Sequence, residues 1–209
     1  MKTNTSFFLE KYGFPFANSY TFHLFNRQHG MVKVSPPGSR NQFGLCGGMC
    51  FAALDIHSVQ KTNEELLSQW GKVILFLLRR QIESLNWHNL IRYVRYQFTD
   101  DESLFGISCL EFEKIKDQIR TNRPVPVGVM HARNFQPLTL NHQIVITGYE
   151  VDINKLILFA YDPNHPLVEA QLVVNYDLGT INQNTGETIR GLFLLKYKAM
   201  PIPWLNLFK

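Results

Sequence analysis

The stretch Gly44–Asp55 reads GLCGGMCFAALD, and in it a glycine-rich turn that carries a cysteine runs directly into a helical pattern of apolar residues. We expect a helix that begins at Cys46 and is central, because small Ala52 and Ala53 indicate close packing on more than one side. A helix N-terminus offers unpaired N–H groups and the positive end of the helix dipole, which favour a thiolate. The stretch therefore predicts a nucleophilic thiol, with a buried pair of core cysteines as the alternative.

The composition is that of one good-sized globular domain. The chain has 209 residues, of which 45% are hydrophobic and 18% are charged, so it can bury a substantial core. Its formal net charge of +4 comes from basic residues spread without a basic block, and we expect no nucleic-acid partner. Three cysteines do not make a disulfide framework.

No segment has the pattern of a membrane span or a secretory signal. The longest strongly apolar run, Val73–Leu78, is closed by Lys72 and Arg79 and is far shorter than the roughly 18 residues that cross a bilayer. Residues 1–10 lack the apolar centre of a signal peptide. We expect no membrane span and a cytoplasmic location by default, with export by a route that needs no such signal as the alternative.

Helical patterns fill the first part of the chain and strand patterns the second. After an irregular arm that ends near residue 40, with one extended piece at 20–25, we expect helices starting at Cys46 and near Thr62, and over 72–84, 86–97 and 109–120. Within them we expect His88, Arg92 and Arg95 to form an exposed face, and the acidic run Asp100–Glu102 to close the helical half. We expect strands at 125–130, 143–149, 155–161, 168–174 and 191–197.

Helices followed by strands favour an α+β fold over the alternation that builds parallel doubly wound sheets. We expect one domain over residues 1–209, with an arm and helical lobe up to about residue 123 and a β-sheet lobe from about 124 onward.

Two residues of the strand-rich part are candidates for chemistry. His142 opens one expected strand, and Asp162 follows the next. If the two strands form an antiparallel pair through the polar turn at 150–154, the start of the first lies beside the end of the second. A cysteine nucleophile needs an imidazole within reach and a group that orients the imidazole, and these residues supply both. We interpret His131 and Asp152 as surface or turn residues.

Four motifs follow one another between Gln42 and Pro163. They are Cys-Gly-x-x-Cys-x-Ala at 46–52, Pro-Val-x-Val-x-Val at 124–129, His-x-x-Val-x-x-Gly-Tyr at 142–149, and Ala-x-Asp-Pro at 160–163. In this order and spacing the chain resembles the papain-like cysteine peptidases. The pattern is most similar to the branch that includes the bacterial double-glycine leader peptidases of bacteriocin exporters and their free-standing relatives.

The resemblance implies a papain-like fold, in which a central nucleophile helix packs on an antiparallel sheet, and a thiol hydrolase of peptide or amide bonds. Position by position, it implies Cys46 as nucleophile, His142 as general base and acid, and Asp162 as the residue that orients the imidazole. The same triad serves acyltransferases and deamidases, and an inactive module that binds a peptide or protein is a further alternative. We expect a peptide or protein substrate, no cofactor and no metal.

The oxyanion donor and the choice of cysteine stay open at this point. The family usually has a glutamine about six residues before the nucleophile, where this chain has Arg40, so Gln42 and Asn41 are the candidates for the oxyanion site. Cys50, one helical turn after Cys46, is the alternative nucleophile. A zinc site built on these cysteines and His57 is disfavoured, because no second Cys or His pair lies at a finger-like distance.

Overall fold

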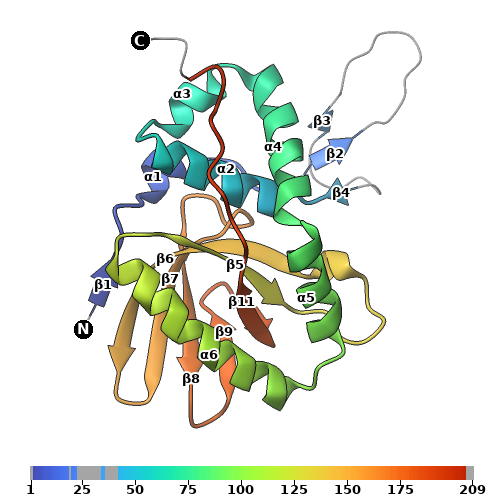
Figure 1. The fold of residues 1–209 in the computed structure, drawn as a ribbon, viewed down its shortest axis with the longest axis vertical. Helices are drawn as coiled ribbons and strands as arrows, with labels where there is room; N and C mark the ends of the chain where they lie inside the picture. The colour runs from blue at the N-terminus through green and yellow to red at the C-terminus, as the bar shows by residue number, and fades with distance from the viewer. Residues whose placement is uncertain (1, 19, 23–33, 36–41, 206–209) are drawn as a thin grey trace.

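The computed structural model describes residues 2–18, 20–22, 34–35 and 42–205, and it combines helices with one large antiparallel sheet. Helices α1 to α4 gather above the sheet, and α6 lies across one of its faces (Figure 1). The helices are α1 (Leu9–Tyr12), α2 (Cys46–Ser58), α3 (Asn63–Leu67), α4 (Trp70–Ser84), α5 (Trp87–Gln97), α6 (Asp101–Arg120) and the 3₁₀ turn η1 (Leu138–Leu140).

The large sheet has the order β10-β9-β8-β7-β6-β5-β11, and β1 pairs with the far part of β6. All these pairings are antiparallel, which confirms the predicted α+β class with an antiparallel sheet. A small sheet has the order β3-β2-β4. The strands are β1 (Lys2–Asn4), β2 (Tyr20–Phe22), β3 (Val34–Ser35), β4 (Gln42–Phe43), β5 (Val125–Met130), β6 (His142–Asp152), β7 (Lys155–Tyr161), β8 (Glu169–Asn175), β9 (Thr180–Gln183), β10 (Thr188–Ile189) and β11 (Gly191–Leu194).

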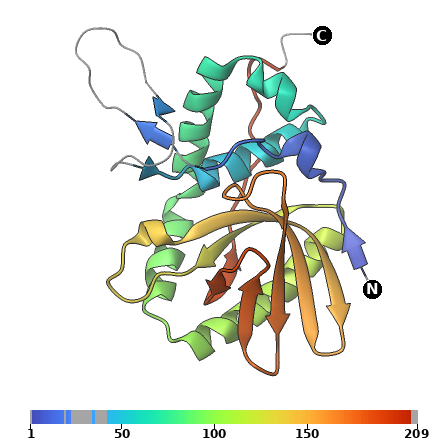
Figure 2. The same cartoon turned by 180° about the vertical axis from the view of Figure 1, so that it is seen from behind.

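Both faces of the central strands are covered. One face packs on α6, through residues such as Phe112 and Ile115 of the helix against Ile144 and Ile146 of β6. On the other side, Val145 joins a core that the helices around α2 complete. The view from behind shows the sheet in front of α6, so the two views agree on this layering (Figure 2). Because successive side chains of a strand point to opposite faces, a strand covered on both sides is apolar throughout.

Two details of the helices differ from the sequence predictions. The acidic run opens α6 instead of closing the helical half, because Asp100 is its N-cap and accepts a hydrogen bond from the Ser103 N–H at 2.8 Å. Arg92 is not part of an exposed face. Its guanidinium donates to the Leu194 carbonyl at 2.7 Å and lies 3.3 Å from the carboxylate of Glu111.

The apolar run Val73–Leu78 lies inside α4 and packs on the helical core. Among the residues that the structure describes, no helix combines the length and the apolar character needed to cross a bilayer.

Helix α2 is buried on nearly all sides, as the small residues of its sequence predict. Every residue from Gly47 to Ile56 is buried, and α4 packs directly against it. At Gly48 the backbones come so close that an added Cβ atom would overlap the Leu77 carbonyl oxygen of α4. The Gly48 N–H donates to Oε1 of Gln81 in α4 at 2.8 Å, so this first-turn N–H is satisfied.

We expect the substitution Gly48→Ala to lower the free energy of unfolding by about 1–3 kcal/mol, because the methyl group must push α2 away from the α4 backbone. Gly106→Ala is the matched control: this glycine lies inside α6 with nothing within 4 Å of the added atom, so the change should stabilise by about 0.5–1 kcal/mol. Urea unfolding of both variants measures the difference. The same effect in both would rule out close packing as the role of Gly48.

A buried ion pair joins α2, α4 and the C-terminal segment. The Asp55 carboxylate lies 2.8 Å from Nε of Arg80, and both side chains are almost fully enclosed. The same carboxylate accepts hydrogen bonds from the Tyr197 hydroxyl at 2.8 Å and from the Met200 N–H at 2.9 Å. This network links the C-terminal half of α2 to α4 and to the C-terminal segment.

Candidate active site

Cys46 is the first residue of α2, and its side chain is half-buried. The helix begins at the residue that the glycine-rich turn predicts. Its position puts the thiol at the positive end of the helix dipole, where backbone N–H groups favour an anion.

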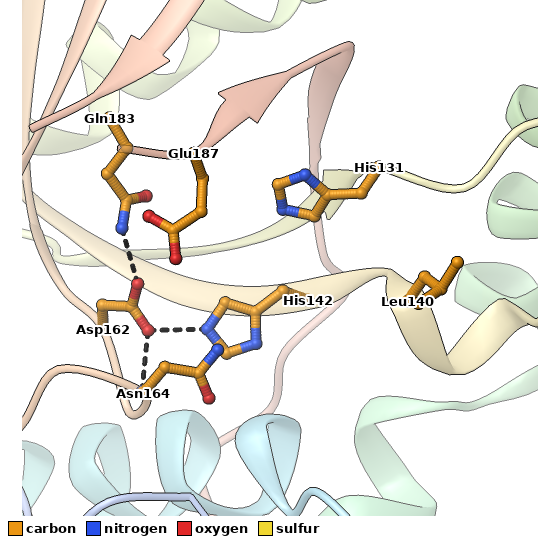
Figure 3. A pocket seen from close by; sticks show the side chains of 7 residues that line it. All are labelled: His131, Leu140, His142, Asp162, Asn164, Gln183 and Glu187. Atoms are coloured by element: carbon orange, nitrogen blue, oxygen red, sulfur yellow. Dashed lines mark hydrogen bonds and ion pairs between the residues drawn. The ribbon is translucent and has the colours of Figure 1, made fainter. Parts of the chain in front are cut away.

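His142 and Asp162 lie next to each other at the open end of the β6–β7 hairpin, opposite its turn. His142 opens β6 and pairs with Val129 of β5, while Asp162 directly follows β7. Because β6 and β7 are antiparallel, with Val145 opposite Tyr161, the start of one lies beside the end of the other. The Nε2 atom of His142 lies 2.6 Å from Oδ1 of Asp162. The other ring nitrogen faces away from Asp162 (Figure 3).

Asp162 is 1% exposed, and hydrogen-bond donors surround its carboxylate. Besides His142, the backbone N–H of Asn164 donates to Oδ1 at 2.8 Å, and the side-chain amide of Gln183 donates to Oδ2 at 2.7 Å. Burial raises the pKa of this carboxyl group, but the hydrogen bonds from His142, Asn164 and Gln183 and the charge of His142 together hold it below its ordinary value. Asp162 is therefore ionised at neutral pH.

His142 interacts with both the carboxylate and the thiol. Burial lowers the pKa of the imidazole, but the negative charge of Cys46 and the hydrogen bonds to Asp162 and Cys46 outweigh it and raise that pKa to about 10. The charge state of the imidazole thus depends on both the Asp162 carboxylate and Cys46. Such an arrangement favours a thiolate–imidazolium pair, which is the reactive form of a cysteine nucleophile.

Cys50 has a different environment from Cys46. Its thiol is fully buried and donates to the Gln143 carbonyl at 3.2 Å. Burial raises the pKa of the Cys50 thiol well above the ordinary range, and the nearby charges of Cys46 and Asp162 add to this. A thiol without access to solvent cannot reach a substrate, so the geometry favours Cys46 as the nucleophile.

Of the two candidate oxyanion donors, Asn41 lies outside the described residues. For Gln42 the structure describes the backbone, which forms β4 and pairs with Thr21 of β2. Gln42 therefore belongs to β4 and precedes Cys46 by four positions in the chain.

A cavity of about 240 Å³ lies beside the histidine–aspartate pair (Figure 3). His131, which directly follows β5 and is partly exposed, also lines it. Its Nδ1 atom lies 3.1 Å from the Thr188 carbonyl, and burial lowers the pKa of its imidazole. Asp152, at the end of β6, is exposed.

Gln183 and Glu187 also line this cavity, and sequence reasoning missed both. Gln183 ends β9, a four-residue strand of sequence TINQ. This strand is too short and polar to stand out in the hydrophobic pattern. The one local signal that could have found it is the asparagine and glycine residues of the segment 184–186, which are typical of a hairpin turn.

Within the described ranges, no group of three or more His, Cys, Asp or Glu side chains is arranged to hold a metal ion. His57 belongs to the far end of α2, where its Nε2 atom lies 3.1 Å from the Ser6 hydroxyl. Comparisons with protein-family models, with curated protein sequences and with solved structures found no match.

Proposed function

We propose that this chain is a papain-like thiol hydrolase that cleaves a peptide or amide bond, with Cys46 as nucleophile, His142 as general base and acid, and Asp162 as the orienting residue. The observation that carries the proposal is the His142 imidazole. One of its nitrogens donates to a buried, ionised carboxylate, and Cys46, a half-buried thiol at a helix N-terminus, contributes to the raised pKa of the ring.

The proposed papain-like fold has two kinds of support. The four sequence motifs occur in the order of that family, and the three proposed catalytic residues begin or directly follow regular elements of the structure. The cysteine begins a central helix, and the histidine and aspartate belong to two adjacent antiparallel strands. Residues on rigid elements hold a reactive geometry better than residues on loops.

In the proposed reaction the Cys46 thiolate attacks the carbonyl carbon. An S–C bond forms, and the π electron pair of the C=O bond moves onto the oxygen. The imidazolium of His142 then gives its proton to the leaving nitrogen, the C–N bond breaks, and a thioester remains on Cys46. His142, now neutral, takes a proton from water, and the resulting hydroxide attacks the thioester to release a carboxylic acid. The backbone N–H of Cys46, assisted by Gln42 or Asn41, would stabilise the oxyanion.

A peptide library derived from a whole proteome tests this function. The wild-type chain should generate new peptide termini at a consistent sequence pattern, and Cys46→Ala should generate none. Cleavage that persists in Cys46→Ala would refute the proposed nucleophile. Binding of peptides without cleavage by the wild-type chain would favour the inactive binding module, and ligated or deamidated products would favour the acyltransferase or deamidase.

A further inference from the structure

We propose that Gln183 is a positioning residue of this site: its side-chain amide fixes the Asp162 carboxylate in the orientation and charge state that His142 requires. This inference rests on the proposed function. Gln183 is 7% exposed, and its Nε2 atom lies 2.7 Å from Oδ2 of Asp162. The other carboxylate oxygen, Oδ1, faces His142. Figure 3 shows Asp162 held between the two side chains.

The amide of Gln183 can have only one orientation here. Both hydrogens on Nε2 are used, one by Asp162 and one by the Thr185 hydroxyl oxygen at 2.8 Å. The Thr185 hydroxyl in turn donates to the carboxylate of Glu187, so its oxygen is free to accept from Gln183. A flipped amide would turn its own oxygen toward the Asp162 carboxylate and lose both hydrogen bonds.

The backbone holds this amide in place. The Gln183 N–H donates to the Glu187 carbonyl at 2.8 Å, and the Gly186 N–H donates to the Gln183 carbonyl at 3.0 Å, which closes a tight turn after β9. The Glu187 carboxylate is itself 3.1 Å from Nε2 of His165. Side-chain contacts therefore run from Asp162 through Gln183, Thr185 and Glu187 to His165, and Gln183 is the member that reaches Asp162.

Removal of the amide would leave Oδ2 of Asp162 buried without this donor. The carboxylate would then be harder to keep ionised, and it would stabilise the His142 imidazolium less well. If the protonated form of His142 is less stable, the thiolate–imidazolium pair with Cys46 is less stable as well. The consequence should be seen at low pH, where formation of the thiolate depends on that pair, and not at high pH, where any thiol ionises.

The rate of Cys46 alkylation by iodoacetamide, followed by mass spectrometry from pH 5 to pH 9, tests the proposal. Gln183→Met keeps the shape of the side chain but removes the donor, and we expect the rate at pH 5 to fall about tenfold to a hundredfold. The rate at pH 9 should match the wild type. Thr185→Val acts one hydrogen bond further from Asp162, so it should lower the rate at pH 5 by a smaller factor and leave the rate at pH 9 unchanged. This second variant keeps the test decisive if Gln183→Met does not fold.

Gln183→Glu distinguishes positioning from a merely structural role. Burial and the neighbouring carboxylate raise the pKa of a glutamic acid at this place, so at pH 5 it carries a proton that it can donate to Asp162. This variant should therefore keep a rate near that of the wild type at pH 5. Gln171→Glu is the control for the addition of a carboxyl group as such, because it adds the same group on neighbouring β8. Among the described residues, the hydrogen-bond partners of Asp162 do not include Gln171.

Two results would overturn the proposal for Gln183 while the proposed function stands: an unchanged rate at pH 5 in Gln183→Met, or an equal loss in Gln183→Met and Gln183→Glu. A different result would overturn the proposed function and this inference together. This result would be that Cys46 of the wild-type chain reacts with iodoacetamide no faster at pH 5 than Cys109, the other partly exposed cysteine of the described residues.

Discussion

Replacement of His142 by alanine should slow the alkylation of Cys46 by iodoacetamide at pH 6 on the order of a hundredfold. An ordinary thiol, with a pKa of about 8.5, is less than about 1% thiolate at this pH. In the wild type, the pKa of His142 is raised to about 10, so its ring is a cation at pH 6, and a cation beside a thiol favours the reactive thiolate. The difference should shrink as the pH rises past 8, because the unpaired thiol then ionises by itself.

The control for this experiment is His131→Ala. His131 lines the cavity beside His142, but its ring nitrogen Nδ1 is engaged by the Thr188 carbonyl and not by the thiol. The loss of this imidazole should leave the labelling rate of Cys46 nearly unchanged. Equal losses in the two variants, or none in His142→Ala, would contradict the pairing of Cys46 with His142.

Asp55→Ala should lower the free energy of unfolding by about 3–5 kcal/mol, the usual effect of removing one partner of a buried ion pair. The change takes from the guanidinium of Arg80, which is 1% exposed, its fully buried carboxylate partner and leaves it the partly exposed Glu83. It also removes the acceptor of the Tyr197 hydroxyl and of the Met200 N–H. Urea unfolding, monitored by circular dichroism, measures the loss.

Arg79→Ala is the matched control for this prediction. Arg79 belongs to the same helix and pairs with Glu83 at 3.2 Å, but its side chain is 66% exposed, so the loss should stay below about 1 kcal/mol. The double variant Asp55→Leu with Arg80→Met should regain part of the stability lost in Asp55→Ala, because it leaves no unpaired charge in the core. If Asp55→Ala cost no more than Arg79→Ala, the buried network would not hold α2 in place.

The parts of the site that local sequence could predict are those that depend on one helix start or one hairpin. The glycine-rich turn places Cys46 at the first residue of α2, and the predicted bounds of β5 and β7 agree with the structure. Antiparallel pairing of neighbouring strands then brings His142 to Asp162, because such pairing needs only a short polar turn between them.

The parts that local sequence could not predict depend on contacts between distant segments. Gln183 reaches Asp162 only because β9 pairs with β8 and β8 with β7, and no hydrophobic pattern marks β9. Arg92 looks like a surface residue from its spacing, but Glu111 of α6 supplies a buried carboxylate for it. In both cases the partner lies on another element, so the pattern around the residue carries no sign of it.

The charge state of His142 tests the central claim most directly. Nuclear magnetic resonance of histidine-labelled protein, with His142→Ala to assign the signal, should show an imidazolium that persists through pH 8, since the pKa is raised to about 10. A group is protonated below its pKa, so the titration should begin only above pH 8. In Cys46→Ser the negative charge is gone, and the titration should move to clearly lower pH. A neutral imidazole at pH 7 in the wild type, or the same titration in both proteins, would contradict a Cys46–His142 ion pair.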